Sequence, residues 1–196
     1  MHKHYGGVFI MQKNGNRWSV KTLVFMALIV AMQMILTRII ALDIGPYRIS
    51  VGSVCTVLAG LWIGPVAGGC CGFVADILGC FMKGYAVNPM ITLAAVLWGV
   101  IPALMRPLFI NRGKFGKTIG IVIAVTISNI LCSFILTTVG LVVIQGYSFV
   151  AILPGRIAQL IFNIPVYSIL TCLVYFSPIT RMVFDTHTNV YKKATL

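Results

Sequence analysis

The sequence contains very few acidic side chains and no recognisable catalytic motif. Only three of its 196 residues are Asp or Glu, and its three histidines, His2, His4 and His187, lie in the polar terminal segments. HExxH, GxSxG and Walker lysine motifs are absent. We therefore expect no catalytic residues, and an ATP-driven step would need a partner protein.

The cysteines do not form a metal-binding pattern. None of the six belongs to a CxxC pair or to a Cys/His group with metal-ligand spacing. Most of them lie in apolar stretches, where buried free thiols are the simplest expectation. We predict that this chain binds no metal and no cofactor.

Apolar residues are abundant instead. They make up 59% of the chain, and the mean hydropathy of +1.00 is too high for a soluble domain. A membrane-spanning helix needs about 20 apolar residues, so this length allows five or six spans and no substantial soluble domain. The 15 basic residues fit the flanks of membrane helices and contact with anionic lipid better than they fit nucleic-acid binding. We predict an all-α integral membrane protein.

The pattern of apolar runs and turn residues predicts six transmembrane helices in one compact bundle. Their expected ranges are 21–42, 48–64, 66–82, 89–109, 117–143 and 153–179. Residues 21–180 form the membrane domain in this interpretation. Residues 1–20 are a polar cytoplasmic segment without the features of a signal peptide, and residues 181–196 are a basic cytoplasmic tail.

The distribution of basic residues predicts the orientation. Eleven of the fifteen lie in the N-terminal segment, the loop after the fourth helix and the C-terminal tail. The positive-inside rule therefore places both termini in the cytoplasm. The other four, Arg38, Arg48, Lys83 and Arg156, then fall at or near external helix ends. Asp43 and Asp76 lie in the same external half.

Polar residues recur at helical spacing within four of the expected helices. The stripes are Gly72, Asp76, Gly79 and Lys83 in the third helix; Asn88 and Thr92 in the fourth, with Trp98 beside them; Asn129 and Ser133 in the fifth; and Arg156, Gln159, Asn163 and Tyr167 in the sixth. Ionisable groups at membrane depth normally face a protein interior or a water-filled cavity. The stripes predict a ligand cavity that opens externally.

Each candidate also has a structural explanation. Arg38 and Arg48 can extend to the membrane interface as snorkelling side chains. Other members can join helices by hydrogen bonds, pack in the core or sit in an interfacial aromatic belt; these are Gln159, Asn163, Trp98 and Tyr85. Asp76 is harder to explain in this way, because a carboxylate beside glycines has little interfacial role. Arg156 stands at a helix start, where the helix dipole disfavours a cation, and therefore points to an anionic partner.

The chemistry of these side chains narrows the ligand. Guanidinium groups bind carboxylates, and a carboxylate suits a donor-rich edge such as that of an amino-pyrimidine. Trp98 and Tyr85 can stack on a ring. A ligand with an anionic end and a donor-rich heterocycle would satisfy all of them.

Four segments carry a resemblance to a known family: RIIALDIGPYRISVG, AGLWIGPVAGGCCGFVADILG, NPMITLAAVLWGVIP and LPGRI. From about Ala27 to Tyr175 the chain resembles the substrate-binding S components of energy-coupling factor (ECF) vitamin transporters, specifically the folate branch. The resemblance implies six helices and an external vitamin pocket. It also implies capping loops between helices one and two and between three and four.

The resemblance also implies roles for individual residues. Arg38 and Arg156 contact folate at its glutamate carboxylates or linker, with Asp76 and Gly79 near the pterin. The polar stripes and the aromatic residues add further ligand-site candidates: Asn88, Gln159, Asn163, Trp98 and Tyr85. Arg48 is a second choice for the ligand site, because Asp43 and Arg48 can pair with each other and set the loop between the first two helices. The pair Ala27 and Ala31 matches an AxxxA pattern that docks on the scaffold subunit, because small residues let helices approach closely.

We therefore expect a folate-binding S component in the bacterial cell membrane. Its partners would be a transmembrane scaffold subunit, two cytoplasmic ATPases and membrane lipid, and it would deliver folate by tilting in the membrane. One alternative is an S component for another vitamin or a queuosine precursor. A second is a membrane assembly protein whose polar stripes only join helices. The shortage of acidic residues argues against an intramembrane enzyme.

Overall fold

The computed structural model describes residues 20–38, 42–44, 47–84, 86–109, 111–178 and 180. Most of the two predicted terminal segments, residues 1–19 and 181–196, lies outside the described residues, as does Tyr85. The side chains of Arg38 and of the strand residues, Asp43 and Arg48 among them, also lie outside the description.

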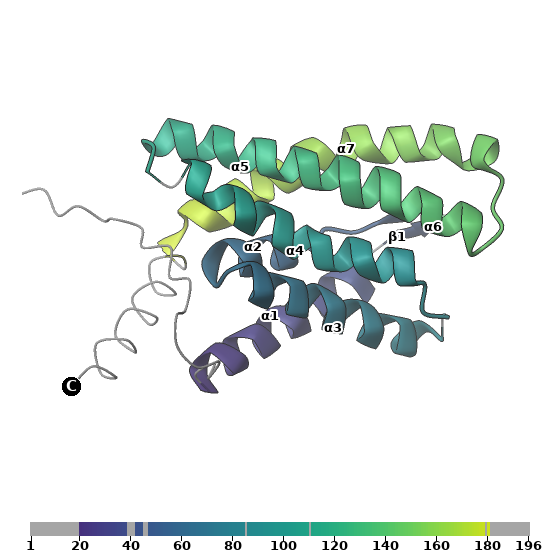
Figure 1. The fold of residues 1–196 in the computed structure, drawn as a ribbon, viewed down its shortest axis with the longest axis horizontal. Helices are drawn as coiled ribbons and strands as arrows, with labels where there is room; N and C mark the ends of the chain where they lie inside the picture. The colour runs from purple at the N-terminus through teal and green to yellow at the C-terminus, as the bar shows by residue number, and fades with distance from the viewer. Residues whose placement is uncertain are drawn as a thin grey trace, which may run out of the picture.

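The described chain is a bundle of helices with one short β-hairpin, which confirms the predicted all-α class (Figure 1). The helices are α1 (Val20–Arg38), α2 (Ser53–Trp62), α3 (Pro65–Lys83), α4 (Pro89–Phe109), α5 (Lys114–Ser128) and α7 (Phe149–Phe176). Helix α5 continues through the π-helix η1 (Asn129–Leu136) into α6 (Thr137–Val143), so that residues 114–143 form one membrane-length helix. Five helices in the described ranges are long and apolar enough to cross a membrane.

The segment between α1 and α2 differs from the prediction. The first helix was expected to reach residue 42 and the second to begin at 48, but strands β1 (Leu42–Ile44) and β2 (Tyr47–Ile49) form an antiparallel hairpin there. The Gly45-Pro46 pair between the strands favours a turn, because proline lacks an N–H for a helix. Helix α2 consequently has only 10 residues. At about 1.5 Å per residue, it covers half of a roughly 30 Å hydrocarbon core.

The last helix begins earlier than predicted. It starts at Phe149 and continues through Pro154, whereas the sequence predicted a start at residue 153. Arg156 therefore lies about two turns inside the helix, and the prediction that it stands at a helix start, where the dipole disfavours a cation, was wrong. In apolar surroundings backbone groups are satisfied within a helix, so the apolar residues before the proline are helical as well.

Helices α2, α3 and α4 meet through glycines. A Cβ at Gly60 would overlap the carbonyl oxygen of Gly99, and a Cβ at Gly99 would overlap the carbonyl group of Gly68. A Cβ at Gly68 would lie 2.7 Å from the Gly60 Cα. The three backbones are therefore in direct contact, which larger residues would prevent.

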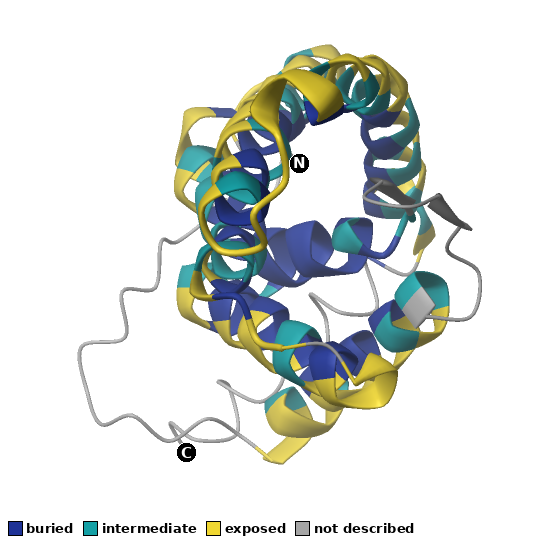
Figure 2. Cartoon of the chain, turned by 90° about the vertical axis from the view of Figure 1, so that its right-hand side faces the viewer, coloured by how far each residue is buried: buried dark blue, intermediate teal, exposed yellow. Residues whose placement is uncertain are grey.

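The outer and inner surfaces of the bundle differ in composition. Exposed apolar side chains such as Leu28, Phe81 and Ile161 lie on α1, α3 and α7, and Figure 2 shows exposed residues mainly on the outward sides of the helices. Buried polar residues occur inside, among them Gln33, Asn129 and Arg156. This arrangement is the one expected of a membrane-embedded protein that encloses polar groups.

Candidate substrate-binding site

Asp76 on α3 is hydrogen-bonded to α4. The Thr92 hydroxyl donates to Asp76 Oδ2 at 2.7 Å, and its oxygen also lies 3.2 Å from the backbone oxygen of Asn88. Asp76 is half-buried and Thr92 is buried. Helical spacing placed Asp76 on the stripe of the third helix and Thr92 on that of the fourth. The structure shows that these two side chains are in contact. The contact holds one carboxylate oxygen of Asp76 in place.

Asn88 links the start of α4 to α6. Its Nδ2 donates to the Gly140 carbonyl at 2.9 Å, and its Oδ1 accepts from the Met90 backbone N–H at 3.1 Å. The second bond caps α4 in the way that Asn side chains cap helices. Both ends of this amide are thus engaged in protein contacts. The geometry shows that Asn88 holds the start of α4 against α6, and its ligand contact stays a prediction.

Arg156 and Gln159 contact each other on α7. Arg156 Nη1 donates to Gln159 Oε1 at 3.1 Å, which is the i to i+3 contact that the stripe predicted. Arg156 is only 6% exposed, and Asn163 on the same stripe is 2% exposed. A guanidinium buried within a membrane bundle suits a carboxylate, because charge-assisted bonds to a carboxylate offset its desolvation.

An aromatic pair joins α4 to α7. The rings of Trp98 and Tyr167 are 5.4 Å apart and meet edge to face at 69°. The Tyr167 hydroxyl donates to the Ser50 carbonyl, just after the hairpin. Sequence reasoning left Tyr167 out of the site. Its place on the stripe of Arg156, Gln159 and Asn163 was the signal that could have included it.

Strands β1 and β2 place opposite charges in register. Asp43 is the cross-strand partner of Arg48, and Leu42 and Ile44 pair with Ile49 and Tyr47. Facing positions of opposite charge stabilise an antiparallel pair. The backbone therefore agrees with the interpretation that Asp43 and Arg48 shape the loop between the first two helices.

The remaining residues that the sequence predicted for ligand binding or partner docking lie in several different elements. Gly79 is buried on α3. Ala27 and Ala31 are both exposed on α1, where a partner helix has access to them. The predicted ligand roles of Arg38, Arg48 and Tyr85 fall on side chains outside the described part of the chain.

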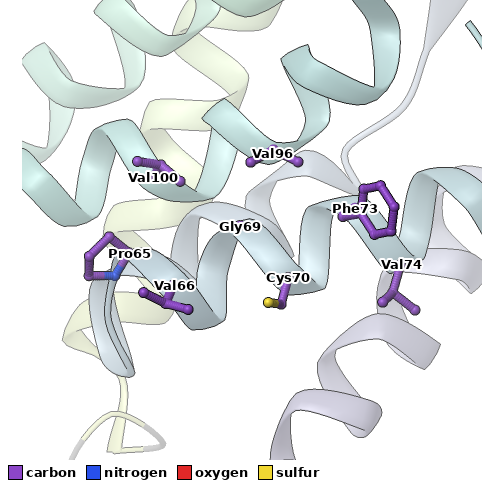
Figure 3. Close-up of a pocket in the computed structure, with 8 residues that line it drawn as sticks. All are labelled: Pro65, Val66, Gly69, Cys70, Phe73, Val74, Val96 and Val100. Carbon is purple, nitrogen blue, oxygen red and sulfur yellow. The ribbon is translucent and has the colours of Figure 1, made fainter. Parts of the chain in front are cut away.

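An apolar groove of about 330 Å³ lies between α3 and α4, away from these polar residues. Figure 3 shows Cys70 and Phe73 on one side of it and Val96 and Val100 on the other. Its lining offers almost no polar group to orient a vitamin. The groove is therefore not the site that the polar stripes predicted.

Comparisons with known proteins agree with this architecture. A family model described as "ECF transporter, substrate-specific component" matches residues 21–175. The chain is 26% identical over 152 residues to a protein named "Folate transporter FolT" from Clostridium novyi (strain NT), across 76% of this chain and 85% of that protein.

Two solved structures share the fold. A FolT structure bound with folic acid has a TM-score of 0.69 at 23% identity and covers 82% of this chain and 96% of that one. A ThiT structure from Listeria monocytogenes has a TM-score of 0.63 at 22% identity with the same coverage. Because the family model spans most of its length, the chain belongs to the substrate-specific S components of ECF transporters, multi-pass membrane subunits that are not enzymes and that rely on partner ATPases.

Proposed function

We propose that this S component captures folate from outside the cell and delivers it inward with its ECF partners. The observation that carries the proposal is a combination of groups on packed helices. Arg156 supplies a buried guanidinium, Asp76 a carboxylate fixed by Thr92, and Trp98 with Tyr167 an aromatic pair. Folate offers a match to each: glutamate carboxylates, a donor-rich pterin and flat rings.

The orientation of the ligand follows from these side chains. Arg156 binds the carboxylate end, and Asp76 accepts hydrogen bonds from the pterin, with Gly79 beside it. Arg38 and Arg48 are further proposed ligand contacts from the segment between the first two helices. The curated relative and the solved structure named for folate support this ligand class.

The proposed assembly uses the exposed face of α1. Ala27 and Ala31 dock on the transmembrane scaffold subunit, where their small side chains permit close helix contact. Both termini face the cytoplasm in this arrangement, with residues 1–20 and 181–196 flanking the membrane domain. Two ATPase subunits complete the transporter, and the S component tilts within the membrane to release folate inward.

The alternative is a different vitamin, because the fold is shared with a ThiT structure at a similar TM-score. Mass spectrometry of the ligand that co-purifies with the protein discriminates the two, and a folate is expected. In parallel, folate should raise the melting temperature of the purified protein, while riboflavin, thiamine and biotin should not. A shift with one of those three and none with folate would refute the proposal. A protein that only joins helices would respond to none of them.

A further inference from the structure

Asn129 is a buried amide that the protein itself does not satisfy. Its side chain is 0% exposed, and neither Nδ2 nor Oδ1 has a hydrogen-bond partner in the described part of the chain. Gln33 provides the contrast, because its buried Oε1 accepts a hydrogen bond from Thr56 at 2.7 Å. Buried polar groups are nearly always paired, so an amide with two unused atoms requires an explanation.

Asn129 lies in an unusual stretch of helix. It is the first residue of η1, an eight-residue π-helix that packs against both α4 and α7. π-helical turns within α-helices are rare, and those that do occur are often found at functional sites. The two neighbouring helices are the ones that carry Trp98, Tyr167 and Arg156.

The depth of Asn129 can be derived from one hydrogen bond. The Asn88 side chain bonds to the Gly140 carbonyl, so these two residues lie at the same level. From this level, α4 leads forward along the sequence to the opposite end of the bundle, and the helix that contains Gly140 leads backward along the sequence to the same end (Figure 1). Asn129 is eleven residues from Gly140, and Trp98 is ten residues from Asn88. Both positions are therefore about 15 Å below that level.

A second observation points to the same level of the bundle. Ser168, next to Tyr167 on α7, is also buried, and within the described residues its hydroxyl has no hydrogen-bond partner. The ring of Tyr167 contacts Trp98. Asn129 and Ser168, two unsatisfied polar residues on different helices, thus both lie near the level of the Trp98–Tyr167 pair.

We propose that Asn129 is a ligand-recognition residue that binds the heterocyclic end of the substrate. Its amide presents a donor and an acceptor side by side, which matches a heterocycle edge with an adjacent acceptor and donor. Asp76 is bonded to Thr92, six residues before Trp98 on α4. The carboxylate and the amide therefore lie about 9 Å apart along the bundle and contact different edges of one flat ring system. The identity of that ring as a pterin rests on the proposed folate function.

The test compares Asn129→Leu with the matched control Gln33→Leu in purified protein. Leucine removes an unsatisfied amide at position 129, so the melting temperature without ligand should stay the same or rise. The Gln33 variant removes a satisfied amide and should melt at a lower temperature. Asn129→Ser serves as a smaller second variant if leucine prevents folding.

Binding is measured with folate, with pteroate, which lacks the glutamate, and with p-aminobenzoylglutamate, which lacks the pterin. Asn129→Leu should weaken binding of folate and pteroate by about 10- to 100-fold, because the heterocycle loses its partner. It should leave p-aminobenzoylglutamate unaffected, and Gln33→Leu should leave all three affinities unchanged. A lower melting temperature with wild-type folate affinity would overturn the inference.

Failure of the folate proposal gives a different result. In that case wild-type protein binds none of the three probes. Asn129 is then tested by the melting temperatures and by the ligand that co-purifies with wild-type protein. The inference holds if Asn129→Leu loses that ligand without loss of stability, and it fails if the variant retains the ligand.

Discussion

Two sides of helix α4 perform different tasks. Gly99 contacts the backbones of α2 and α3 and leaves no room for a side chain. Trp98, the preceding residue, contacts Tyr167 on α7, the helix that also carries Arg156. Neighbouring residues of an α-helix point about 100° apart, so Gly99 faces α2 and α3 while Trp98 faces α7. The glycine side is fixed by backbone contacts, whereas the other side is joined to α7 by a contact between side chains.

The largest expected effect comes from breaking the glycine side. Gly99→Ser adds a Cβ that overlaps the Gly68 carbonyl group, so that the backbone of α3 or α4 would have to shift. We expect a loss of about 3 kcal/mol or more in folding stability, although serine is the better helix former. Gly113→Ser is the matched control, because a Cβ there meets no atom within 4 Å. Size-exclusion chromatography and thermal melting measure the difference, and equal stability of the two variants would contradict the packing described above.

Removing the guanidinium should have the next largest effect. Arg156→Ala should lower folate affinity by about 100-fold, since a buried charge-assisted pair is lost. Arg156→Lys should restore little of it, because lysine cannot bind a carboxylate bidentately. Isothermal titration measures both variants, and pteroate serves as the control ligand that should be affected less. An unchanged folate affinity in Arg156→Ala would remove Arg156 from the site.

A smaller effect is expected at the aromatic pair. Tyr167→Phe keeps the ring against Trp98 and removes the hydroxyl, which donates to the Ser50 carbonyl and is also hydrogen-bonded to the Ser53 side chain. The loss of one buried hydrogen bond corresponds to about 1 kcal/mol, so folate affinity should fall by roughly fivefold as the segment after the hairpin loosens. Tyr167→Leu should weaken binding further by removing the ring. Equal affinities for the two variants would assign no role to the aromatic contact.

The smallest effect is predicted at the link between α3 and α4. Thr92→Val removes the hydroxyl that donates to Asp76 while it preserves side-chain shape. Folate affinity should fall by a few fold, on the order of 1 kcal/mol or less, because Asp76 keeps its charge but loses its orientation. Thr118→Val is the control, since the Thr118 hydroxyl bonds only within its own helix to the Lys114 carbonyl. A loss of affinity in the control as large as that of Thr92→Val would show that the effect is not local.

The sequence was informative where a pattern extends over many residues. Apolar runs predicted the five long helical segments, although α2 is shorter than the predicted range 48–64. Helical spacing placed Asp76 and Thr92 on stripes that meet in space. Short features were missed, because three-residue strands such as Leu42–Ile44 carry no periodicity that distinguishes them from a helix. The identity of contacting glycines was also unpredictable, since many glycines follow the same spacing.

The hydrogen-bond partners of individual polar residues could not be predicted either. Asn88 and Asn129 are both asparagines in apolar helical surroundings, yet Asn88 uses both ends of its amide and Asn129 neither within the described chain. This difference depends on how α4 and α6 meet at Gly140, which is a property of tertiary packing. Sequence patterns indicate that such residues face inward, and only the packed bundle separates those that are paired within the described chain from those that are not.

The short helix α2 ends at Trp62, a buried tryptophan that can serve as an internal fluorescence standard. Its residues from Val54 to Trp62 are all buried, so their surroundings are set by the protein and not by lipid. The indole of Trp62 packs on Phe25 and donates to the Thr180 hydroxyl, while that of Trp98 lies against Tyr167. In a Trp18→Phe background, Trp62 alone (with Trp98→Phe) should keep a constant emission when ligand is added, whereas Trp98 alone (with Trp62→Phe) should report changes at its contact with Tyr167.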